Sequence, residues 1–205
     1  MYLYPLWIRL WHLINALAVV ILIVTGLSMF LAGNSATQLF DEASKAARWH
    51  NVSAAILTIS YLFFVTGNII SENGKYYKIR KGTFFSDLTG QLKYYLCDMF
   101  RGKKDPFRAT FEQKFNPLQK ITYIVTMYIA LPLLIISGVG LMLPEKTLNS
   151  LFGLNSLVVT DILHIIIGFF IVLFLAIHIF LSTLAPGSPS GLSGIITGYK
   201  RTNEE

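Results

Sequence analysis

Apolar residues gather into four long stretches of this chain, and polar residues gather between them. The stretches cover residues 6–31, 50–70, 118–143 and 161–184, and none has Lys, Arg or Glu in its central part. A helix needs about 20 apolar residues to cross a bilayer, so each stretch is long enough to span it. The pattern predicts an all-α membrane protein, a bundle of four transmembrane helices forming a single domain over residues 1–205.

Two local features refine this prediction. No small-residue cleavage pattern clearly ends the first stretch, so we expect a retained helix rather than a signal peptide. Pro132 is expected to kink the third helix, because a proline inside a helix removes one hydrogen bond. The carbonyl that it leaves free is tolerable inside a bundle of helices.

Composition and charge support a membrane protein and indicate its orientation. Only 14% of the residues are charged, against about 25% in a typical soluble domain. The net charge of +6 comes mainly from Lys and Arg in the segment 71–117, whereas residues 144–160 hold only Lys146 against Glu145. The positive-inside rule therefore predicts that both termini and the loop 71–117 are cytoplasmic. Membrane topology accounts for the basic residues, so we predict no binding of nucleic acid.

The long loop contains one further pattern. Leu88, Leu92, Tyr95 and Met99 recur at roughly helical spacing beside basic residues, which fits an amphipathic helix at the membrane surface. A cytoplasmic loop that packs on a partner would fit equally well. Cys97 is the single cysteine, so the chain can form no internal disulfide and no cysteine-based iron–sulfur or zinc site.

The four histidines of the chain all lie in or at the ends of the predicted spans: His12, His50, His164 and His178. Ionisable groups at membrane depth are costly and usually functional. His164 and His178 are 14 residues apart on one helix, which places them on one face and about 21 Å apart in depth. His50 should open the second helix at the outer surface, at the depth of His164. His12 lies near the cytoplasmic end of the first helix, at the depth of His178.

Two histidine pairs stacked across the bilayer are typical of a protein that binds two haems. Imidazole pairs are good axial ligands for haem iron, whereas zinc or copper usually needs three or four donors in one place. We therefore predict b-type haems between His12 and His178 and between His50 and His164. Gly26 lies 14 residues after His12, on the same face and at the depth of the outer haem, and could leave room for it. Gly168 lies one turn from His164, and further gaps between helices are expected at Gly67, Gly138 and Gly140. Ordinary packing of small residues between helices would explain the same glycines.

Two arginines are candidates for binding the haem propionates. Arg9 and Arg48 lie near the expected haem depths and could form charge-assisted hydrogen bonds with these carboxylates. Anchoring at the membrane interface is the alternative role for both side chains.

Three sequence segments resemble the bacterial cytochrome b561-type family. They are RLWHLINA over residues 9–16 followed by Thr25-Gly26, FNPLQK over residues 115–120 followed by Ser137-Gly138, and the His164–His178 spacing. The family includes the cytochrome b (gamma) subunits of membrane-bound formate dehydrogenases, nickel–iron hydrogenases and thiosulfate reductases. The resemblance covers nearly the whole chain and implies the same two haem ligand pairs. It also implies a location in the bacterial cytoplasmic (inner) membrane.

The resemblance further implies a quinone site near the cytoplasmic-side haem, built by Asn116 and Gln119 beside His178. Menaquinone or ubiquinone would be the substrate. The family usually has small residues between the Asn and the Gln, whereas this chain has Pro117 and Leu118. Asn116 also fits a helix N-cap with Pro117 at the first helical position, and the two roles are compatible.

The function expected from the resemblance is electron transfer across the membrane. The partners would be an iron–sulfur subunit, a catalytic subunit with molybdenum, tungsten or nickel–iron, quinone and lipid. A stand-alone dihaem quinone oxidoreductase is one alternative, and a haem-free membrane anchor is another. A proton-coupled transporter is disfavoured, because the spans hold no buried carboxylate and show no inverted repeat.

Overall fold

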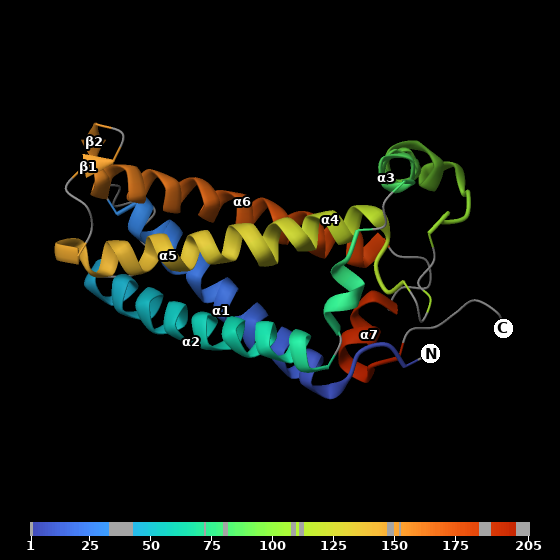
Figure 1. Cartoon of the computed structure of the whole chain (residues 1–205), viewed down its shortest axis with the longest axis horizontal. Coiled ribbons are helices and arrows are strands. Elements are labelled where there is room, and N and C mark those ends of the chain that lie inside the picture. Colours follow the sequence, from blue (N-terminus) through green and yellow to red (C-terminus); the bar gives the residue numbers. More distant parts are fainter. Residues whose placement is uncertain are drawn as a thin grey trace. The chain divides into compact units, whose positions relative to one another are not determined.

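Four helices of the computed structural model are long and apolar enough to cross a membrane, as the hydrophobic pattern predicts (Figure 1). They are α1 (Leu6–Phe30), α2 (Ala43–Ile70), a third helix over residues 117–142, and α6 (Ser156–Leu184). The third consists of α4 (Pro117–Val125), a π-helical turn (Thr126–Ala130) and α5 (Leu131–Met142). The structure describes residues 2–32, 43–71, 73–79, 82–107, 110, 113–146, 150–151, 153–184 and 190–199.

Two of these helices begin earlier than the apolar pattern predicts. Helix α2 starts at Ala43 rather than at residue 50, and α6 starts at Ser156 rather than at residue 161. The prediction that His50 opens its helix is therefore wrong. Residues 43–48 read ASKAAR, and Ala, Lys and Arg are strong helix formers although the segment is not apolar. His50 and His164 consequently lie about two helical turns inside regular helices, where the backbone on both sides is fixed.

The third span changes its helical geometry just before Pro132. The N–H of Leu131 donates to the carbonyl of Thr126, five residues back, instead of four. A proline ring clashes with the carbonyl four residues before it, and a wider turn relieves such crowding. The disturbance that was expected at Pro132 thus takes the form of a π-helical turn on its N-terminal side.

The chain forms two compact units, residues 1–66 with 133–205 and residues 67–132. In the first unit, aromatic rings join α1 to its neighbours. Trp11 stacks on Phe64 of α2 with ring centres 4.3 Å apart, and Phe30 meets Phe169 of α6 edge-on at 5.6 Å. Most other apolar side chains of these helices face outward, among them Leu17, Ile59 and Leu173 at 58–69% exposure. An apolar outer surface over a small core is what a lipid environment permits.

The first unit also contains a helix that the sequence did not predict, α7 (Ser190–Thr197). The N–H groups of Leu3 and Tyr4 donate to the carbonyl of Gly198, and Tyr2 pairs with Tyr199 in an antiparallel bridge. Gly198 has a φ of +85°, a conformation that favours glycine. At the opposite end of α6, a two-stranded hairpin of β1 (Ser150–Leu151) and β2 (Leu154–Asn155) directly precedes the helix. The Tyr2–Tyr199 bridge places the first and last described residues side by side, which is compatible with an even number of spans.

The second unit contains α3 (Phe84–Lys93), which continues through a π-helical turn (Tyr94–Asp98) and a 3-10 turn (Met99–Arg101). The long loop therefore contains a helix, as one of the two interpretations of its sequence requires, and the lipid contact of the stripe stays a prediction. Gln91 and Tyr94 are the buried residues, and Leu92 is 45% exposed. The outward side carries what we call the apolar stripe: Phe85, Leu92, Leu96 and Phe100. Helix α3 packs against α4, beside the first turn of the third span.

Candidate functional site

The first unit brings the four histidines together in two pairs. His12 of α1 and His178 of α6 have ring centres 6.3 Å apart, with their planes at 46°. His50 of α2 and His164 of α6 also have ring centres 6.3 Å apart, with their planes at 66°. The pairing matches the one expected from depth along the spans, and α6 contributes one histidine to each pair.

The spacing within each pair fits a single metal ion held between two imidazoles. An imidazole nitrogen lies about 2.0–2.1 Å from a bound metal such as zinc and roughly 1.1 Å from the centre of its own ring. Two imidazoles on opposite sides of one metal would therefore have ring centres roughly 6.3 Å apart. Both observed distances agree with this value. Among the described residues no group of three or more His, Cys, Asp or Glu could hold a metal ion. The donor set therefore fits bis-imidazole ligation, the pattern of electron-transfer haem.

Hydroxyl groups hold both histidines of the His50–His164 pair. Thr25 Oγ1 of α1 lies 3.0 Å from Nδ1 of His50. Ser137 Oγ of α5 lies 2.9 Å from Nδ1 of His164. Thr25 is 1% exposed and Ser137 is 4% exposed, so water does not compete for either contact. In each case Nδ1 is engaged by the protein, and Nε2 is the nitrogen that remains for a ligand.

A glycine follows each hydroxyl residue and leaves space for the histidine ring. A β-carbon on Gly26 would lie 3.4 Å from Cε1 of His50, and one on Gly138 would lie 3.3 Å from Cε1 of His164. The side-chain position of Gly26 faces the His50 ring, and the room that it would leave for a porphyrin stays a prediction. A β-carbon on Gly168, by contrast, would meet no protein atom within 4 Å.

The surroundings of the His12–His178 pair are different. Phe174, one turn before His178, stacks on its ring with centres 5.7 Å apart. Trp11 Nε1 and Asn15 Oδ1 are buried and have no hydrogen-bond partner among the described residues. Buried polar atoms are nearly always paired, so these two atoms beside His12 are available to water or to a bound polar group.

The two predicted propionate contacts have different environments. Arg9 Nε donates to the carbonyl of Ile195 at 3.0 Å, in the last turn of α7, so part of this guanidinium binds a helix end. Arg48 is exposed and lies two residues before His50. Both contacts with haem stay predictions.

The predicted quinone residues form a capping box at the start of α4, in the second unit. Asn116 Oδ1 accepts from the N–H of Gln119 at 2.8 Å, and Gln119 Oε1 accepts from the N–H of Asn116 at 3.3 Å. Asn116 Nδ2 also donates to the hydroxyl of Tyr95 at 2.9 Å. The N-cap role of Asn116, weighed as an alternative in the sequence, is therefore confirmed. Burial raises the pKa of the Tyr95 phenol, which keeps it protonated.

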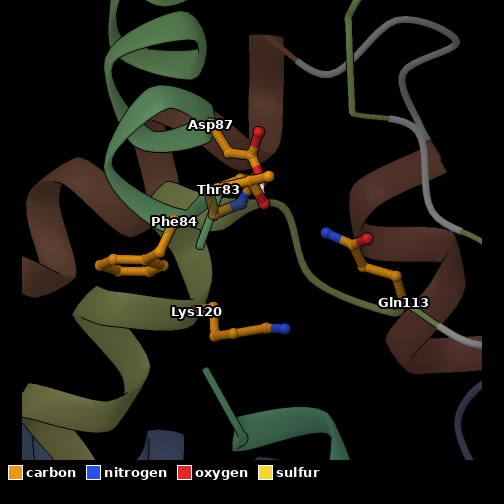
Figure 2. A pocket seen from close by; sticks show the side chains of 6 residues that line it. Thr83, Phe84, Asp87, Gln113 and Lys120 are labelled. Atoms are coloured by element: carbon orange, nitrogen blue, oxygen red, sulfur yellow. Dashed lines mark hydrogen bonds between the residues drawn. The ribbon is translucent and has the colours of Figure 1, made fainter. Parts of the chain in front are cut away.

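A small pocket of about 60 Å³ opens beside this helix start (Figure 2). Figure 2 shows Lys120 and Gln113 extending toward it, while Thr83 donates a hydrogen bond to Asp87 at its upper edge. The pocket is polar and too small for a quinone ring with its tail. Its lining residues are Thr83, Phe84, Asp87, Gln113, Pro117 and Lys120.

A chain of hydrogen bonds in the second unit leads to a buried lysine, Lys114, that no sequence pattern singled out. Lys114 Nζ donates to Asn73 Oδ1, Asn73 Nδ2 donates to Asn68 Oδ1, and Asn68 Nδ2 donates to the hydroxyl of Tyr128. Lys114 is 8% exposed and lies 4.1 Å from the ring centre of Tyr76. Burial, together with the charge of Lys75, lowers the pKa of Lys114 to about 8.

These features describe a multi-pass membrane protein in which four histidines face one another in two pairs. The chain belongs to the prokaryotic cytochrome b561 family, which it matches over residues 3–198. It is also similar to an Escherichia coli (strain K12) protein named "Putative cytochrome YdhU". The two are 31% identical over 200 residues, which is 98% of this chain and 74% of the relative. No solved structure matches the chain.

Membership of this family settles the broad class. The chain is a multi-pass cytochrome b of the bacterial inner membrane, and its family binds b-type haem. The resemblance stated from residues 9–16 and 115–138 is thereby confirmed.

Proposed function

We propose that this chain is a dihaem subunit that carries electrons across the membrane between a protein partner and the quinone pool. The observation that supports this proposal most directly is the pairing of each α6 histidine with a histidine of another helix, at 6.3 Å between ring centres in both pairs. His12 with His178, and His50 with His164, would supply the axial ligands. When bound, a haem with two imidazole ligands supplies one-electron transfer.

The chain's own residues define what each end of this path would do. Helix α6 fixes the two ligand pairs about 21 Å apart along its axis, so electrons would move between two set depths. The positive-inside rule supports a cytoplasmic location for both termini and for residues 71–117. On that orientation the His12–His178 pair is the cytoplasmic-side site, and the His50–His164 pair faces the outer partner.

Quinone chemistry is proposed at the cytoplasmic-side site, next to His178. Asn116 and Gln119 are the candidate contacts. Gln119 uses its Oε1 in the capping box, and its Nε2 makes no hydrogen bond within the described part of the chain, so an amide donor is available. Menaquinone or ubiquinone would accept or release electrons there, with the protons exchanged on the cytoplasmic side.

The partners proposed from the family resemblance are an iron–sulfur subunit and a catalytic subunit with molybdenum, tungsten or nickel–iron. Cys97 is the only cysteine, so this chain cannot bind an iron–sulfur cluster with its own thiolates. Its role would be that of the membrane-embedded, quinone-reactive subunit.

The test is a reduced-minus-oxidised visible spectrum of the protein purified from its native membrane, with haem measured per chain. Two low-spin b-type haems per chain, reducible by a quinol analogue, are the expected result. A colourless protein would overturn the proposal and leave a haem-free anchor. Two haems in a protein that purifies without other subunits, and still reduces quinone with a soluble donor, would favour the stand-alone oxidoreductase.

A further inference from the structure

The hydroxyls of Thr25 and Ser137 determine which nitrogen of His50 and His164 carries the proton. The Thr25 hydroxyl has one hydrogen to donate. Its oxygen, Oγ1, lies 2.7 Å from the carbonyl oxygen of Ile21 and 3.2 Å from that of Leu22. Ser137 Oγ repeats this arrangement, at 2.7 Å from the carbonyl of Leu133 and 3.2 Å from that of Leu134. A carbonyl can only accept, so each hydroxyl hydrogen is directed to its own helix.

The hydroxyl oxygen must therefore accept at its third contact, the histidine Nδ1. If Nδ1 were unprotonated, two lone pairs would face each other at 3.0 Å or 2.9 Å in a buried site. Nδ1–H as the donor satisfies every polar atom, and it leaves the lone pair of Nε2 for iron.

The two histidines are held in the same way from two different helices. On α1 and again on α5, a buried hydroxyl residue fixes Nδ1, and the glycine that follows leaves space at Cε1. His12 has no such hydroxyl partner among the described residues. In the His50–His164 pair, both rings are therefore held by a hydroxyl at Nδ1. In the His12–His178 pair, at least the His12 ring has no such contact among the described residues.

We propose that Thr25 and Ser137 are positioning residues for the His50–His164 pair. Their hydroxyls fix each ring with Nδ1 protonated and Nε2 available to iron, and they lower the reduction potential of the haem held there. The proposal rests on the proposed function, because it requires haem between these histidines. A hydrogen bond at Nδ1–H makes imidazole a more basic ligand. A more basic ligand favours the ferric state over the ferrous state, so the potential falls.

The experiment is a redox titration of the purified protein with both haems resolved, in wild type and in Thr25→Val and Ser137→Ala. Each substitution removes the hydroxyl while keeping similar volume. Loss of an outer-shell partner typically costs about 10–100-fold in metal affinity or activity. A tenfold change in a one-electron equilibrium corresponds to 59 mV. We expect an upward shift of that order, in the same haem for both variants, with the second haem unchanged.

Thr58→Val is the matched control, because the Thr58 hydroxyl also donates to its own helix, at 2.8 Å from the carbonyl of Ala54. Thr25→Ser restores the hydroxyl and should restore the wild-type potential. The proposal is overturned if Thr25→Val shifts no more than Thr58→Val, or if the two test variants shift different haems. If Thr25→Val loses one haem, the Thr25→Ser protein decides the outcome. Both haems bound in Thr25→Ser would support positioning by the hydroxyl, whereas loss of the same haem in Thr25→Ser would also overturn the proposal. Absence of haem in wild type would instead refute the proposed function.

Discussion

A β-carbon on Gly138 would lie 3.3 Å from Cε1 of His164, closer than most side-chain contacts allow. Gly138→Ala should therefore push the His164 ring by a few tenths of an ångström, at a cost of about 1–3 kcal/mol. We expect less haem at the His50–His164 site, measured as haem per chain, with the other haem retained. Val139→Ile adds carbon to a 49% exposed neighbour and should leave both haems in place. Equal haem content in all three proteins would contradict this role of Gly138.

Replacing the histidines one at a time tests the pairing itself. His12→Ala and His178→Ala should each leave one haem per chain with the same spectrum, because each removes a ligand from the same site. His50→Ala and His164→Ala should leave the complementary spectrum. Quinone turnover should disappear in the first two variants, if quinone reacts next to the His12–His178 haem. The pairing is wrong if a variant from each pair gives the same residual spectrum.

The structural role of Gln119 in the capping box and its proposed role at the quinone depend on different side-chain atoms, so one substitution can distinguish them. Gln119→Glu keeps the side-chain oxygen that accepts from the N–H of Asn116, and it replaces only the amide nitrogen. We expect thermal stability near that of wild type and at least a tenfold loss in quinol oxidation at saturating donor. Asn116→Ala removes the cap and should cost about 1 kcal/mol in stability. Unchanged quinol kinetics in Gln119→Glu would exclude Gln119 from the quinone site.

Lys114 predicts how stability depends on pH. Below about pH 8, Lys114 is charged in the folded and unfolded states, and the folded protein bears the cost of a buried charge. Between about pH 8 and 10.5 the folded state releases this proton first, the unfolded state binds more protons, and stability therefore rises with pH. Lys114→Met should abolish the rise in stability that Lys114 contributes. The increase in Tm between about pH 8 and 10.5 should then be smaller than in wild type by at least about 3 °C. A change of about 1 kcal/mol shifts Tm by this amount in a chain of this size.

The control for this measurement is Lys104→Met, because Lys104 is exposed. Its Tm should follow the wild-type curve at every pH. A Lys114→Met protein with the same rise as wild type would show that Lys114 does not titrate in this window.

The apolar stripe of α3 predicts contact with lipid. Helix α3 packs beside the first turn of the third span, and Phe100 is 74% exposed. A nitroxide attached at Phe100→Cys, in a Cys97→Ser background, should be relaxed more strongly by oxygen than by a water-soluble nickel complex in anionic nanodiscs. The same label at the exposed position Arg101→Cys should show the opposite preference. Equal access of both reagents at the two positions would favour a loop that packs on a partner.

The spans and the histidine pairing could be predicted because both depend on periodicity and depth along single helices. The four apolar stretches match four helices, and His164 and His178 share one face because 14 residues nearly complete four turns. The start of α2 was placed late, since hydropathy does not register helical turns built from Ala, Lys and Arg. The start of α6 was placed at Asp161, whereas the helix already includes residues 156–160, SLVVT.

Features that depend on contacts between distant segments could not be predicted. Thr25 and Ser137 were noticed only within family motifs, and their role appears when α1 meets α2 and α5 meets α6. The buried face of α3 was missed for the same reason, because Gln91 is enclosed by tertiary packing although it is polar. A hydroxyl residue directly before a glycine occurs in three spans, at Thr25, Thr66 and Ser137, so this sequence signal alone does not single out the two that contact histidines.

Helix α6 supplies one ligand to each histidine pair, and it is synthesised after α1 and α2. While the ribosome is still producing the third span, the nascent protein holds only half of each pair, His12 and His50. If haem binds these pairs as proposed, its iron can be held from both sides only after the final span has been released into the bilayer. Stable haem loading would then be a late step of biogenesis, and a ribosome that stops before residue 164 would release a product in which neither histidine pair is complete.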